Sequence, residues 1–363
     1  MVAEGALAAG CRFFAGYPIT PASEIYEIMM RRLAEHGGLA LSAPDEISSL
    51  CYCVGASLRG LKAMTATSGP GWALMIETVQ YALMTETPVV IALVQRLGPS
   101  TGGATQGAQG DILLAEFSIS GGYTIPVFAP STASECFELV QHAFNWSERL
   151  RSPVVLLSDK EVGMTTEVVD EASLPRPAIV ERPEADDTTA ADDFGKLERV
   201  PAFAPVGGDR KVTVTGSAHD RRGQLKKNSP EVIETLHHLE RKIEAHASEM
   251  AMSSSDLDRD ASCLLISYGI TTRAAREAVG ILRTNGFPIS FLQIQTLFPV
   301  PVEALIRASK GVDTVFVAEE NLGGQYRTVL APLLAQKRVH GINKLGSMIS
   351  PAEIVRAVSE AKV

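Results

Sequence analysis

The chain has 363 residues, of which 45% are hydrophobic and 21% are charged, and its length favours two globular domains that each bury a sizeable core. A net charge of -9 and the lack of a basic stripe disfavour binding to nucleic acid. The longest apolar runs, such as TPVVIALVQ at residues 87–95, are too short to cross a membrane, so no membrane association is expected.

The five cysteines include no C-x-x-C pair, since only Cys51 and Cys53 are close in the sequence. An iron–sulphur cluster or a structural zinc ion held by this chain alone is therefore not expected, and we predict no metal ligands. The N-terminal residues lack the basic segment that opens an export signal. These features predict a cytoplasmic protein.

Residues 1–158 alternate helical patterns with short apolar runs. Fully apolar strands between helices are typical of a parallel sheet covered on both faces, so this part is predicted to be an α/β domain. The predicted helices span residues 2–10, 22–36, 45–59 and 71–85, and the predicted strands are CRFFAGY, KAMTATS, PVVIALVQ and SPVVLLSD.

Residues 159–262 interrupt this alternation with prolines, the acidic segment EADDTTAADD at 184–193 and a polar helix at about 230–250. The change in composition indicates a linker or an excursion across the surface of a partner. The polar helix carries His237, His238 and His246, which we interpret as solvated side chains.

The alternation resumes at residue 263, and residues 263–363 are predicted to form a second, smaller α/β domain. The predicted helices of this part span residues 271–285, 301–309, 324–336 and 351–360, and the predicted strands are CLLISYG, PISFLQIQTL and VDTVFVAEE.

Ligands of α/β sheets bind at the carboxyl ends of strands, and polar segments follow several predicted strands here. In YPITP, Pro18 and Pro21 restrict the backbone on both sides of Thr20, which either presents its hydroxyl to a ligand or caps the next helix. Glu46 lies in the first turn of a helix, either as a buried proton carrier or as a complement to the helix dipole.

Two glycine-rich segments follow the next strands. SGPG at 68–71 is typical of an anion cradle at a helix start, or of a tight turn with no ligand. In QRLGPSTGGATQGAQGD at 95–111, Arg96 is the only cation. A guanidinium at the end of a strand suits a substrate carboxylate through a bidentate pair, and a structural salt bridge is the alternative.

Together, the segments GYPITPASEI, DEI…VGAS, AMTATSGPGWALMIE and QRLGPSTGGATQGAQGD resemble the α subunit of the 2-oxoacid:ferredoxin oxidoreductases, particularly its 2-oxoglutarate and branched-chain members. The resemblance continues through VTGSAHDRRGQL, ISYGITTRAAREAV, LQIQTLFPVP and VFVAEENLGGQ, and so covers nearly the whole chain. It implies a first domain like the pyrimidine-binding domain of thiamine diphosphate enzymes and a second domain like the C-terminal domain of transketolases.

The resemblance also implies roles for individual residues. Glu46 matches the family glutamate that hydrogen-bonds N1′ of the aminopyrimidine, and Thr20 matches the threonine beside the reacting centre. Arg96 and Thr101 match residues that hold the carboxylate and keto group of the 2-oxoacid. Thr20 is implied to contact the substrate together with them. The further cofactor contacts that it implies are Tyr17, Pro18, Ile19, Ser68 and Gly69.

The implied reaction is the coenzyme A-dependent oxidative decarboxylation of a 2-oxoacid, with 2-oxoglutarate as the first choice, to acyl-CoA and CO2, with electrons passed to ferredoxin. The chain lacks the Gly-Asp-Gly segment that anchors the diphosphate and Mg2+, and it lacks cluster cysteines. The resemblance therefore implies a β subunit that carries Mg2+ and a [4Fe-4S] cluster in an (αβ)2 assembly. Whether γ or δ subunits take part is left open.

A non-catalytic thiamine-fold subunit, with a role in assembly or regulation, is the alternative function. The joint presence of Thr20, Glu46 and Arg96 favours an enzyme, because a decayed site has no reason to keep all three. A branched-chain 2-oxoacid and pyruvate are alternative substrates, since an arginine clamp serves the carboxylate of any 2-oxoacid.

Overall fold

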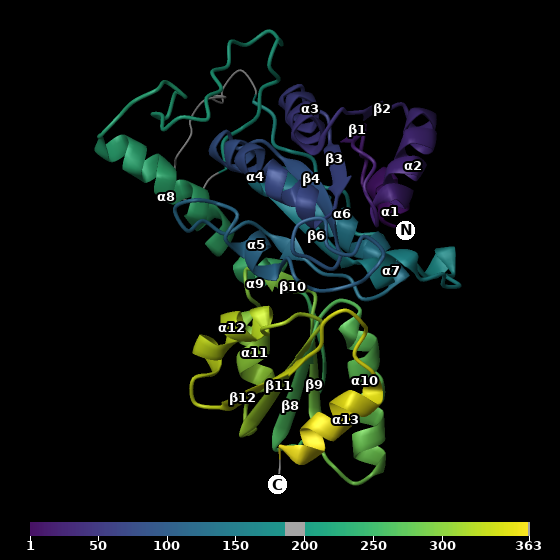
Figure 1. Ribbon diagram of the computed structural model, residues 1–363. Helices are drawn as coiled ribbons and strands as arrows, with labels where there is room; N and C mark the ends of the chain where they lie inside the picture. The colour runs from purple at the N-terminus through teal and green to yellow at the C-terminus, as the bar shows by residue number, and fades with distance from the viewer. Residues whose placement is uncertain (186–199, 362–363) are drawn as a thin grey trace.

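The computed structural model describes residues 1–185 and 200–361, and these residues form two sheets with helices packed against them (Figure 1). Most of the predicted acidic segment 184–193 lies outside the described residues. The predicted α/β class with largely parallel sheets is confirmed. Within the described residues, no helix combines the length and the apolar character that crossing a membrane requires.

The first sheet has the strand order β10-β5-β6-β4-β3-β1-β2, and all its neighbours are parallel except β10 and β5. Its central strands β3, β4 and β6 coincide with apolar runs that the sequence predicts as strands. They are buried along their whole length because helices cover both of their faces. The bounds are β1 Phe13–Gly16, β2 Leu39–Ser42, β3 Ala63–Thr67, β4 Val89–Gln95, β5 Val127–Phe128, β6 Pro153–Asp159 and β10 Thr296–Phe298.

The second sheet has the order β12-β11-β8-β9-β7, with only β7 antiparallel to its neighbour. The predicted strand PISFLQIQTL divides, because its first part forms β9 in the second sheet and its last part forms β10 in the first. The bounds are β7 Ser253–Asp256, β8 Cys263–Ser267, β9 Ser290–Ile294, β11 Thr314–Glu319 and β12 Arg338–Asn343.

The helices pack on both faces of the sheets. They are α1 Val2–Ala8, α2 Ser23–Arg32, α3 Glu46–Leu58, α4 Gly69–Met84, α5 Ile112–Glu116, α6 Ala133–Leu150, α7 Lys160–Met164, α8 Pro230–Glu244, α9 Ala247–Met250, α10 Thr271–Thr284, α11 Val302–Ala308, α12 Gln325–Leu330 and α13 Pro351–Glu360. Three 3-10 turns span Leu33–His36, Glu171–Ser173 and Ala331–Leu334. The predicted helix 22–36 is thus an α-helix that ends in a 3-10 turn.

Several elements were not predicted from the sequence. The edge strands β2 and β12 are mostly exposed, so they show no apolar run that would mark them as strands. Helix α6 does carry a signal, because the Thr132 hydroxyl caps it by accepting from the Glu135 N–H and apolar residues recur on its buried face.

One continuous core joins the two sheets. It lies under α3 and α4 and includes Leu93 of β4, Ile266 of β8 and Val317 of β11. A second core lies between the first sheet and helices α1 and α6, and a third lies between the second sheet and helices α10 and α13. The shared core places the second sheet directly below α5 and β10, as Figure 1 shows, and so fixes which loops of the two parts can meet.

Candidate active site

The four segments singled out in the sequence meet at one edge of the first sheet. Strands β4, β3, β1 and β2 are neighbours in this order and are parallel, so their carboxyl ends lie together. Each strand is followed by one segment, which carries Arg96 after β4, Ser68 after β3, Thr20 after β1 and Glu46 after β2.

Glu46 is the first residue of α3 and is only 8% exposed. Asp45 caps the helix, because its carboxylate accepts from the Ser48 N–H at 2.7 Å. The Glu46 side chain lies against Gly71 of α4, where an added Cβ would come within 2.5 Å of Glu46 Cγ. A glycine at 71 is therefore needed for the carboxyl group to reach the start of α4, and a position in the first turn also suits the helix dipole.

Thr20 does not cap α2, and that interpretation is wrong. The helix begins at Ser23 with Ala22 as the N-cap residue, so Pro21 lies outside the first turn as well. Thr20 is half-buried, and its carbonyl oxygen accepts a hydrogen bond from Arg96. Its backbone is therefore held by Arg96, directly after β4, and not by a capping contact with the helix that follows it.

Arg96 is held by backbone oxygens of the neighbouring segments. Its side chain is 7% exposed and donates through Nη1 to the Thr20 carbonyl at 2.6 Å and through Nη2 to the Thr101 carbonyl at 3.0 Å. Its buried Nε has no hydrogen-bond partner among the described residues, and no ion pair of Arg96 occurs there. The structure thus offers no support for a structural salt bridge, and the guanidinium keeps an unused donor for an anionic ligand.

A cavity of about 420 Å³ opens beside Arg96, between the edge of the first sheet and the second domain. Asp111 lies in its wall, with carboxylate oxygens 2.8 Å from where a Cβ of Gly69 would stand. Burial raises the pKa of Asp111 to about 6, although the charge of Arg96 opposes this shift. The carboxyl group of Asp111 thus lies beside the first residue of α4. It disfavours the interpretation of residues 68–71 as an anion cradle, because the ionised carboxylate would repel a bound anion.

Of the predicted site residues, Arg96 and Gly69 line this cavity. The predicted residues that do not line it are Tyr17, Pro18, Ile19, Thr20, Glu46, Ser68 and Thr101. Tyr17 and Pro18 are exposed, Ile19 packs at the margin of the core under α1 and α6, and the exposed Thr101 is tied to the site through its carbonyl oxygen. The hydroxyl of Ser68 is fully buried and has no hydrogen-bond partner among the described residues.

The second domain supplies part of the cavity wall, which the sequence analysis did not predict. Asn321 and Gln325 line it from the segment after β11, and Gln325 Nε2 donates to the Gly110 carbonyl at 2.8 Å. The apolar part of the wall consists of Pro70, Ala73, Pro99, Ala108, Leu114, Leu322 and Leu345. The available signal was the polar segment NLGGQ directly after the apolar strand VDTVFVAEE.

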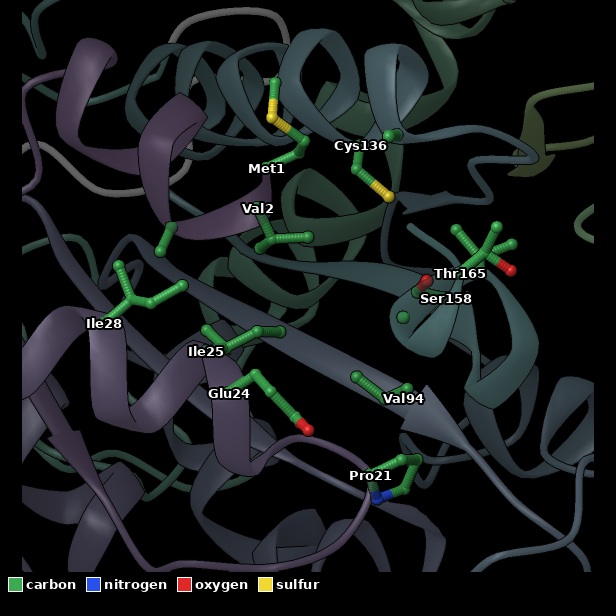
Figure 2. Close-up of a pocket in the computed structure, with 14 residues that line it drawn as sticks. Met1, Val2, Pro21, Glu24, Ile25, Ile28, Val94, Cys136, Ser158 and Thr165 are labelled. Atoms are coloured by element: carbon green, nitrogen blue, oxygen red, sulfur yellow. The ribbon is translucent and has the colours of Figure 1, made fainter. Parts of the chain in front are cut away.

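A second, smaller cavity carries no comparable chemistry. It has a volume of about 110 Å³ and lies between α1, α2 and the end of β4, where Figure 2 shows mainly aliphatic side chains such as Ile25 and Val94 around it. Cys136 reaches it, but burial raises the pKa of this thiol to about 12, so it stays protonated. Among the described residues, no group of three or more His, Cys, Asp and Glu side chains is arranged to hold a metal ion.

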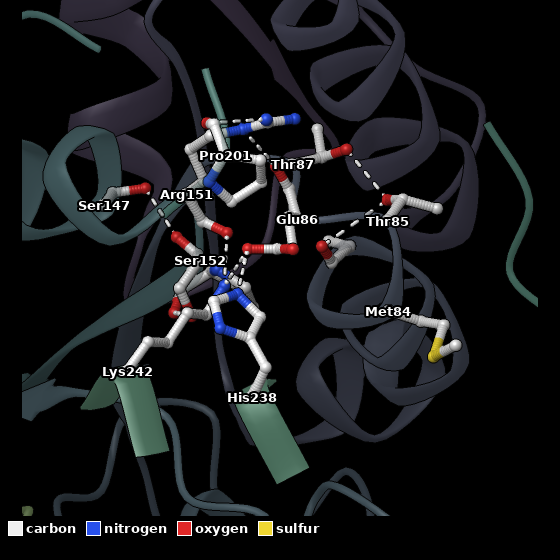
Figure 3. A network of polar contacts seen from close by, with 12 residues as sticks. Met84, Thr85, Glu86, Thr87, Ser147, Arg151, Ser152, Pro201, His238 and Lys242 are labelled. Carbon is white, nitrogen blue, oxygen red and sulfur yellow. Dashed lines mark hydrogen bonds and ion pairs between the residues drawn. The ribbon is translucent and has the colours of Figure 1, made fainter. Parts of the chain in front are cut away.

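The histidines of α8 are not all solvated, which corrects the prediction. His237 is exposed and His238 is fully buried. His238 Nε2 and Lys242 Nζ lie 3.1 Å and 2.9 Å from the Glu86 carboxylate (Figure 3), and since a carboxylate can only accept, both nitrogens donate. We call the four buried residues Glu86, Arg151, His238 and Lys242 the α8 anchor.

Comparisons with known proteins cover nearly the whole length of the chain. The family model "Pyruvate flavodoxin/ferredoxin oxidoreductase, thiamine diP-bdg" matches residues 4–238, and "Pyruvate:ferredoxin oxidoreductase core domain II" matches residues 261–354. The 2-oxoglutarate synthase subunit KorA of Methanocaldococcus jannaschii is 38% identical over 98% of this chain and 96% of its own length.

Two of the solved structures that resemble this one bear on its fold and family. A 2-oxoglutarate:ferredoxin oxidoreductase from Magnetococcus marinus, solved with 2-oxoglutarate, coenzyme A and succinyl-CoA bound, matches 99% of this chain with a TM-score of 0.90 and 29% identity. The present chain spans 63% of that longer chain. A split-gene transketolase matches with a TM-score of 0.58 and 13% identity, which shows a shared fold alone.

Proposed function

This chain belongs to the family of 2-oxoacid:ferredoxin oxidoreductases, and on that premise we propose that it is the α subunit of an enzyme that oxidatively decarboxylates a 2-oxoacid. The products are acyl-CoA and CO2, and the electrons pass to ferredoxin. 2-Oxoglutarate is the substrate we place first, because a relative named for 2-oxoglutarate synthase is 38% identical over nearly the full length of both chains.

The observation that carries the proposal is the arrangement around Arg96. Its guanidinium is buried at the end of β4 and oriented by two backbone carbonyls, so it is preorganised to bind the carboxylate of a 2-oxoacid. Its unpartnered Nε is a donor that such a carboxylate would satisfy. Thr20 and Thr101 act here as the residues that hold the guanidinium and border the substrate.

Glu46 and Ser68 fit the pyrimidine side of thiamine diphosphate. The buried carboxyl group of Glu46 and the unpartnered hydroxyl of Ser68 lie at a glycine-lined helix start, which suits a flat ring that offers both donors and acceptors. When bound, this cofactor supplies a nucleophilic carbon for the keto group and accepts the electrons that remain after CO2 leaves. Glu46 would hold the proton that the ring shares with it.

The other half of the site belongs to a partner in this proposal. Exposed apolar side chains occur on the elements that carry Thr20 and Glu46, namely Tyr17 after β1, Leu41 in β2, and Ile47 and Tyr52 in α3. Such side chains are typical of a surface that a second chain covers. We propose a β subunit in an (αβ)2 assembly, with Mg2+ and a [4Fe-4S] cluster on that subunit, coenzyme A as co-substrate and the cytoplasm as the location.

The decisive experiment is an assay of the chain assembled with its β partner. Reduction of ferredoxin should require a 2-oxoacid and coenzyme A, with the highest kcat/KM for 2-oxoglutarate over a branched-chain 2-oxoacid and pyruvate. Glu46→Gln should lower kcat by at least about 100-fold with an unchanged Tm, because it removes a proton-transfer group. Glu27→Gln on the exposed face of α2 is the matched control and should behave as the wild type.

Two outcomes would contradict the proposal. An assembled complex that turns over none of the three 2-oxoacids would support the alternative of a non-catalytic assembly or regulatory subunit. A Glu46→Gln enzyme with the wild-type kcat would reduce Glu46 to a residue that complements the dipole of α3.

A further inference from the structure

Gln109 lies at the end of the segment that follows β4, and it is fully buried between the two domains. Its Nε2 donates to Asp159 Oδ2 at 3.2 Å and to the Tyr268 carbonyl at 3.1 Å. Its Oε1 accepts from the Thr271 hydroxyl at 2.9 Å and from the Glu320 N–H at 3.0 Å. Every hydrogen-bonding position of the side-chain amide is therefore used, and three of the four partners belong to the second domain.

The backbone of Gln109 is held by the second domain as well. Its N–H donates to the Glu320 carbonyl at 2.7 Å, and its carbonyl accepts from Asn321 Nδ2 at 2.9 Å. The turn that carries Tyr268 approaches closely because it contains Gly269, where a Cβ would stand 2.1 Å from Asp159 Oδ2 and 2.7 Å from Gln109 Nε2. Only glycine permits this approach, and Gly269 has a φ of +55°.

Asp159 ties the two ends of the segment together. One carboxylate oxygen accepts from Gln95 Nε2 at 3.0 Å, and the other accepts from Gln109 Nε2 and from the Ile270 N–H of the second domain at 2.5 Å. Gln95 Oε1 in turn accepts from the Asp111 N–H at 3.0 Å. We call Gln95, Gln109 and Asp159 the loop clamp, because they close a ring around the base of residues 96–111.

The loop clamp lies directly next to the residue that would bind substrate. Arg96 follows Gln95 in the chain, and its guanidinium is held by the carbonyl of Thr101 within the same segment. The segment is folded back on itself, since the Leu97 N–H donates to the Gln106 carbonyl and the Gly103 N–H to the Leu97 carbonyl, both at 2.8 Å. A displacement at Gln109 therefore moves the carbonyl that orients Arg96.

We propose that Gln109 is a positioning residue, through which the second domain sets the place of the Arg96 guanidinium. This inference rests on the proposed function, because it assigns Arg96 to the carboxylate of the 2-oxoacid. It gives the second domain a part in substrate binding that goes beyond its share of the cavity wall. Gln109 itself does not touch the substrate and acts through the backbone of residues 96–111.

A second buried glutamine offers a matched control. Gln293 of β9 is 1% exposed and also joins the domains, since its Nε2 donates to the Ser131 hydroxyl at 3.1 Å and to the Glu135 carboxylate at 2.9 Å. Its partners lie at the start of α6, which is not part of the cavity beside Arg96. Gln109→Met and Gln293→Met each keep the side-chain length and remove only the side-chain hydrogen bonds between the domains, so the backbone contacts of Gln109 with Glu320 and Asn321 stay in place.

The test compares KM, kcat and Tm of the two variants in the assembled enzyme. We expect Gln109→Met to raise KM for the 2-oxoacid about tenfold or more with a smaller change in kcat, because it weakens the binding of the substrate carboxylate. Gln293→Met should lower Tm with a KM within about twofold of the wild type. Equal changes in KM for the two variants, or an unchanged KM in Gln109→Met, would overturn the proposal.

Amide hydrogen exchange supplies a readout that does not depend on turnover. In Gln109→Met the amides of Leu97, Gly103 and Gln106 should exchange faster, and in Gln293→Met they should exchange as in the wild type. If the wild-type assembly turns over no 2-oxoacid, the proposed function fails, while the exchange experiment still decides whether Gln109 orders the segment. Unchanged exchange in Gln109→Met would refute the positioning role.

Thr271→Val is the milder variant if Gln109→Met does not fold. It removes only the hydroxyl that donates to Gln109 Oε1 and keeps the shape of the side chain. We expect a smaller rise in KM, of about two- to fivefold, with the same faster exchange of residues 97–106. A wild-type KM together with wild-type exchange would count against the proposal.

Discussion

The α8 anchor and the loop clamp are both buried polar networks that join the first sheet to a later part of the chain, and they differ in charge. In the α8 anchor, Glu86 faces the unlike charge of Lys242 together with His238. In the loop clamp, Asp159 faces neutral N–H donors and lies near two further acids, Glu161 and Glu320.

The pKa values follow this difference. Burial by itself raises the pKa of Glu86, but Lys242 and His238 outweigh it and lower that pKa to about 2. Burial raises the pKa of Asp159 to about 8, and Glu320 and Glu161 add to the shift although the N–H donors oppose it. We infer that the paired network stabilises the docking of α8, whereas the loop clamp orients a segment at the cost of burying an unpaired acid.

The largest expected effect comes from breaking the α8 anchor. Lys242→Met leaves the Glu86 carboxylate buried beside an uncharged side chain and should destabilise the fold by about 3–5 kcal/mol. Kinetics of the folded fraction should stay at the wild-type level, because the anchor lies outside the cavity beside Arg96. Thermal unfolding and steady-state assays on the same preparation measure both.

The exposed pair Lys226–Glu231 is the control for that prediction. Both side chains lie at the surface near the start of α8, so Lys226→Met should leave the Tm unchanged within error. The double variant Glu86→Gln/Lys242→Met should regain part of the lost stability, because no charge is stranded. A Lys242→Met protein as stable as the wild type would show that the anchor contributes nothing.

An intermediate effect is expected for Arg96→Lys, which tests what the loop clamp positions. A lysine cannot reproduce the bidentate pair with a carboxylate, so kcat/KM should fall roughly 10- to 150-fold, equivalent to about 1.5–3 kcal/mol. The Tm should change little, since Arg96 has no ion pair among the described residues. Kinetics and thermal unfolding on one preparation test this.

Arg151→Lys in the α8 anchor is the matched comparison for Arg96→Lys. Arg151 is also a buried arginine that donates to backbone carbonyls, among them those of Glu86 and Pro201. Unlike Arg96, it lies near the buried charge of Glu86 and over the Phe203 ring, so Arg151→Lys should lower the Tm and leave KM unchanged. A fall in Tm without a change in kinetics for Arg96→Lys would assign Arg96 a structural role.

The last predictions concern pH, and the two networks should respond in opposite directions. The folded pKa of Glu86 is below its unfolded value of 4.5, so its contribution is present above pH 4.5 and is lost as pH falls towards 2. The folded pKa of Asp159 is above its unfolded value of 3.8, so its contribution is complete below pH 3.8 and is lost as pH rises through 8.

Unfolding measured from pH 2 to pH 9 separates the two contributions. Asp159→Asn should flatten the decline in stability between pH 5 and pH 8, and Glu86→Gln should flatten the decline below pH 4.5. The same slope in wild type and Asp159→Asn would mean that Asp159 has an ordinary pKa. Because Glu320 also has a pKa raised to about 7 by burial, the flattening should be partial.

Local patterns in the sequence were sufficient for much of the fold. The apolar strands β4 and β6 are buried on both faces, and strands of that kind pair in parallel under helices. The placement of Thr20, Glu46, Ser68 and Arg96 at one edge follows from the same rule, since the carboxyl ends of parallel strands lie together. The roles of these residues remain predictions.

Contacts between distant parts of the chain could not be predicted in this way. His238 looks solvated in the sequence because α8 is polar, yet packing against the loop that carries Glu86 buries it. Thr20 looks like a helix cap because proline follows it, but α2 begins only at Ser23. In both cases a tertiary contact outweighs a weak local preference.

By itself the sequence determined the fold class, the order of the strand-end segments and the family, because each depends on patterns within a few residues. Only the tertiary structure decided that Gln109 and Asp159 join the Arg96 segment to the second domain. Gln109 is 50 positions from Asp159 and 212 positions from Asn321, the residues with which it forms hydrogen bonds. No local pattern encodes which distant donor meets a buried carboxylate, since that pairing depends on how the two sheets pack around their common core.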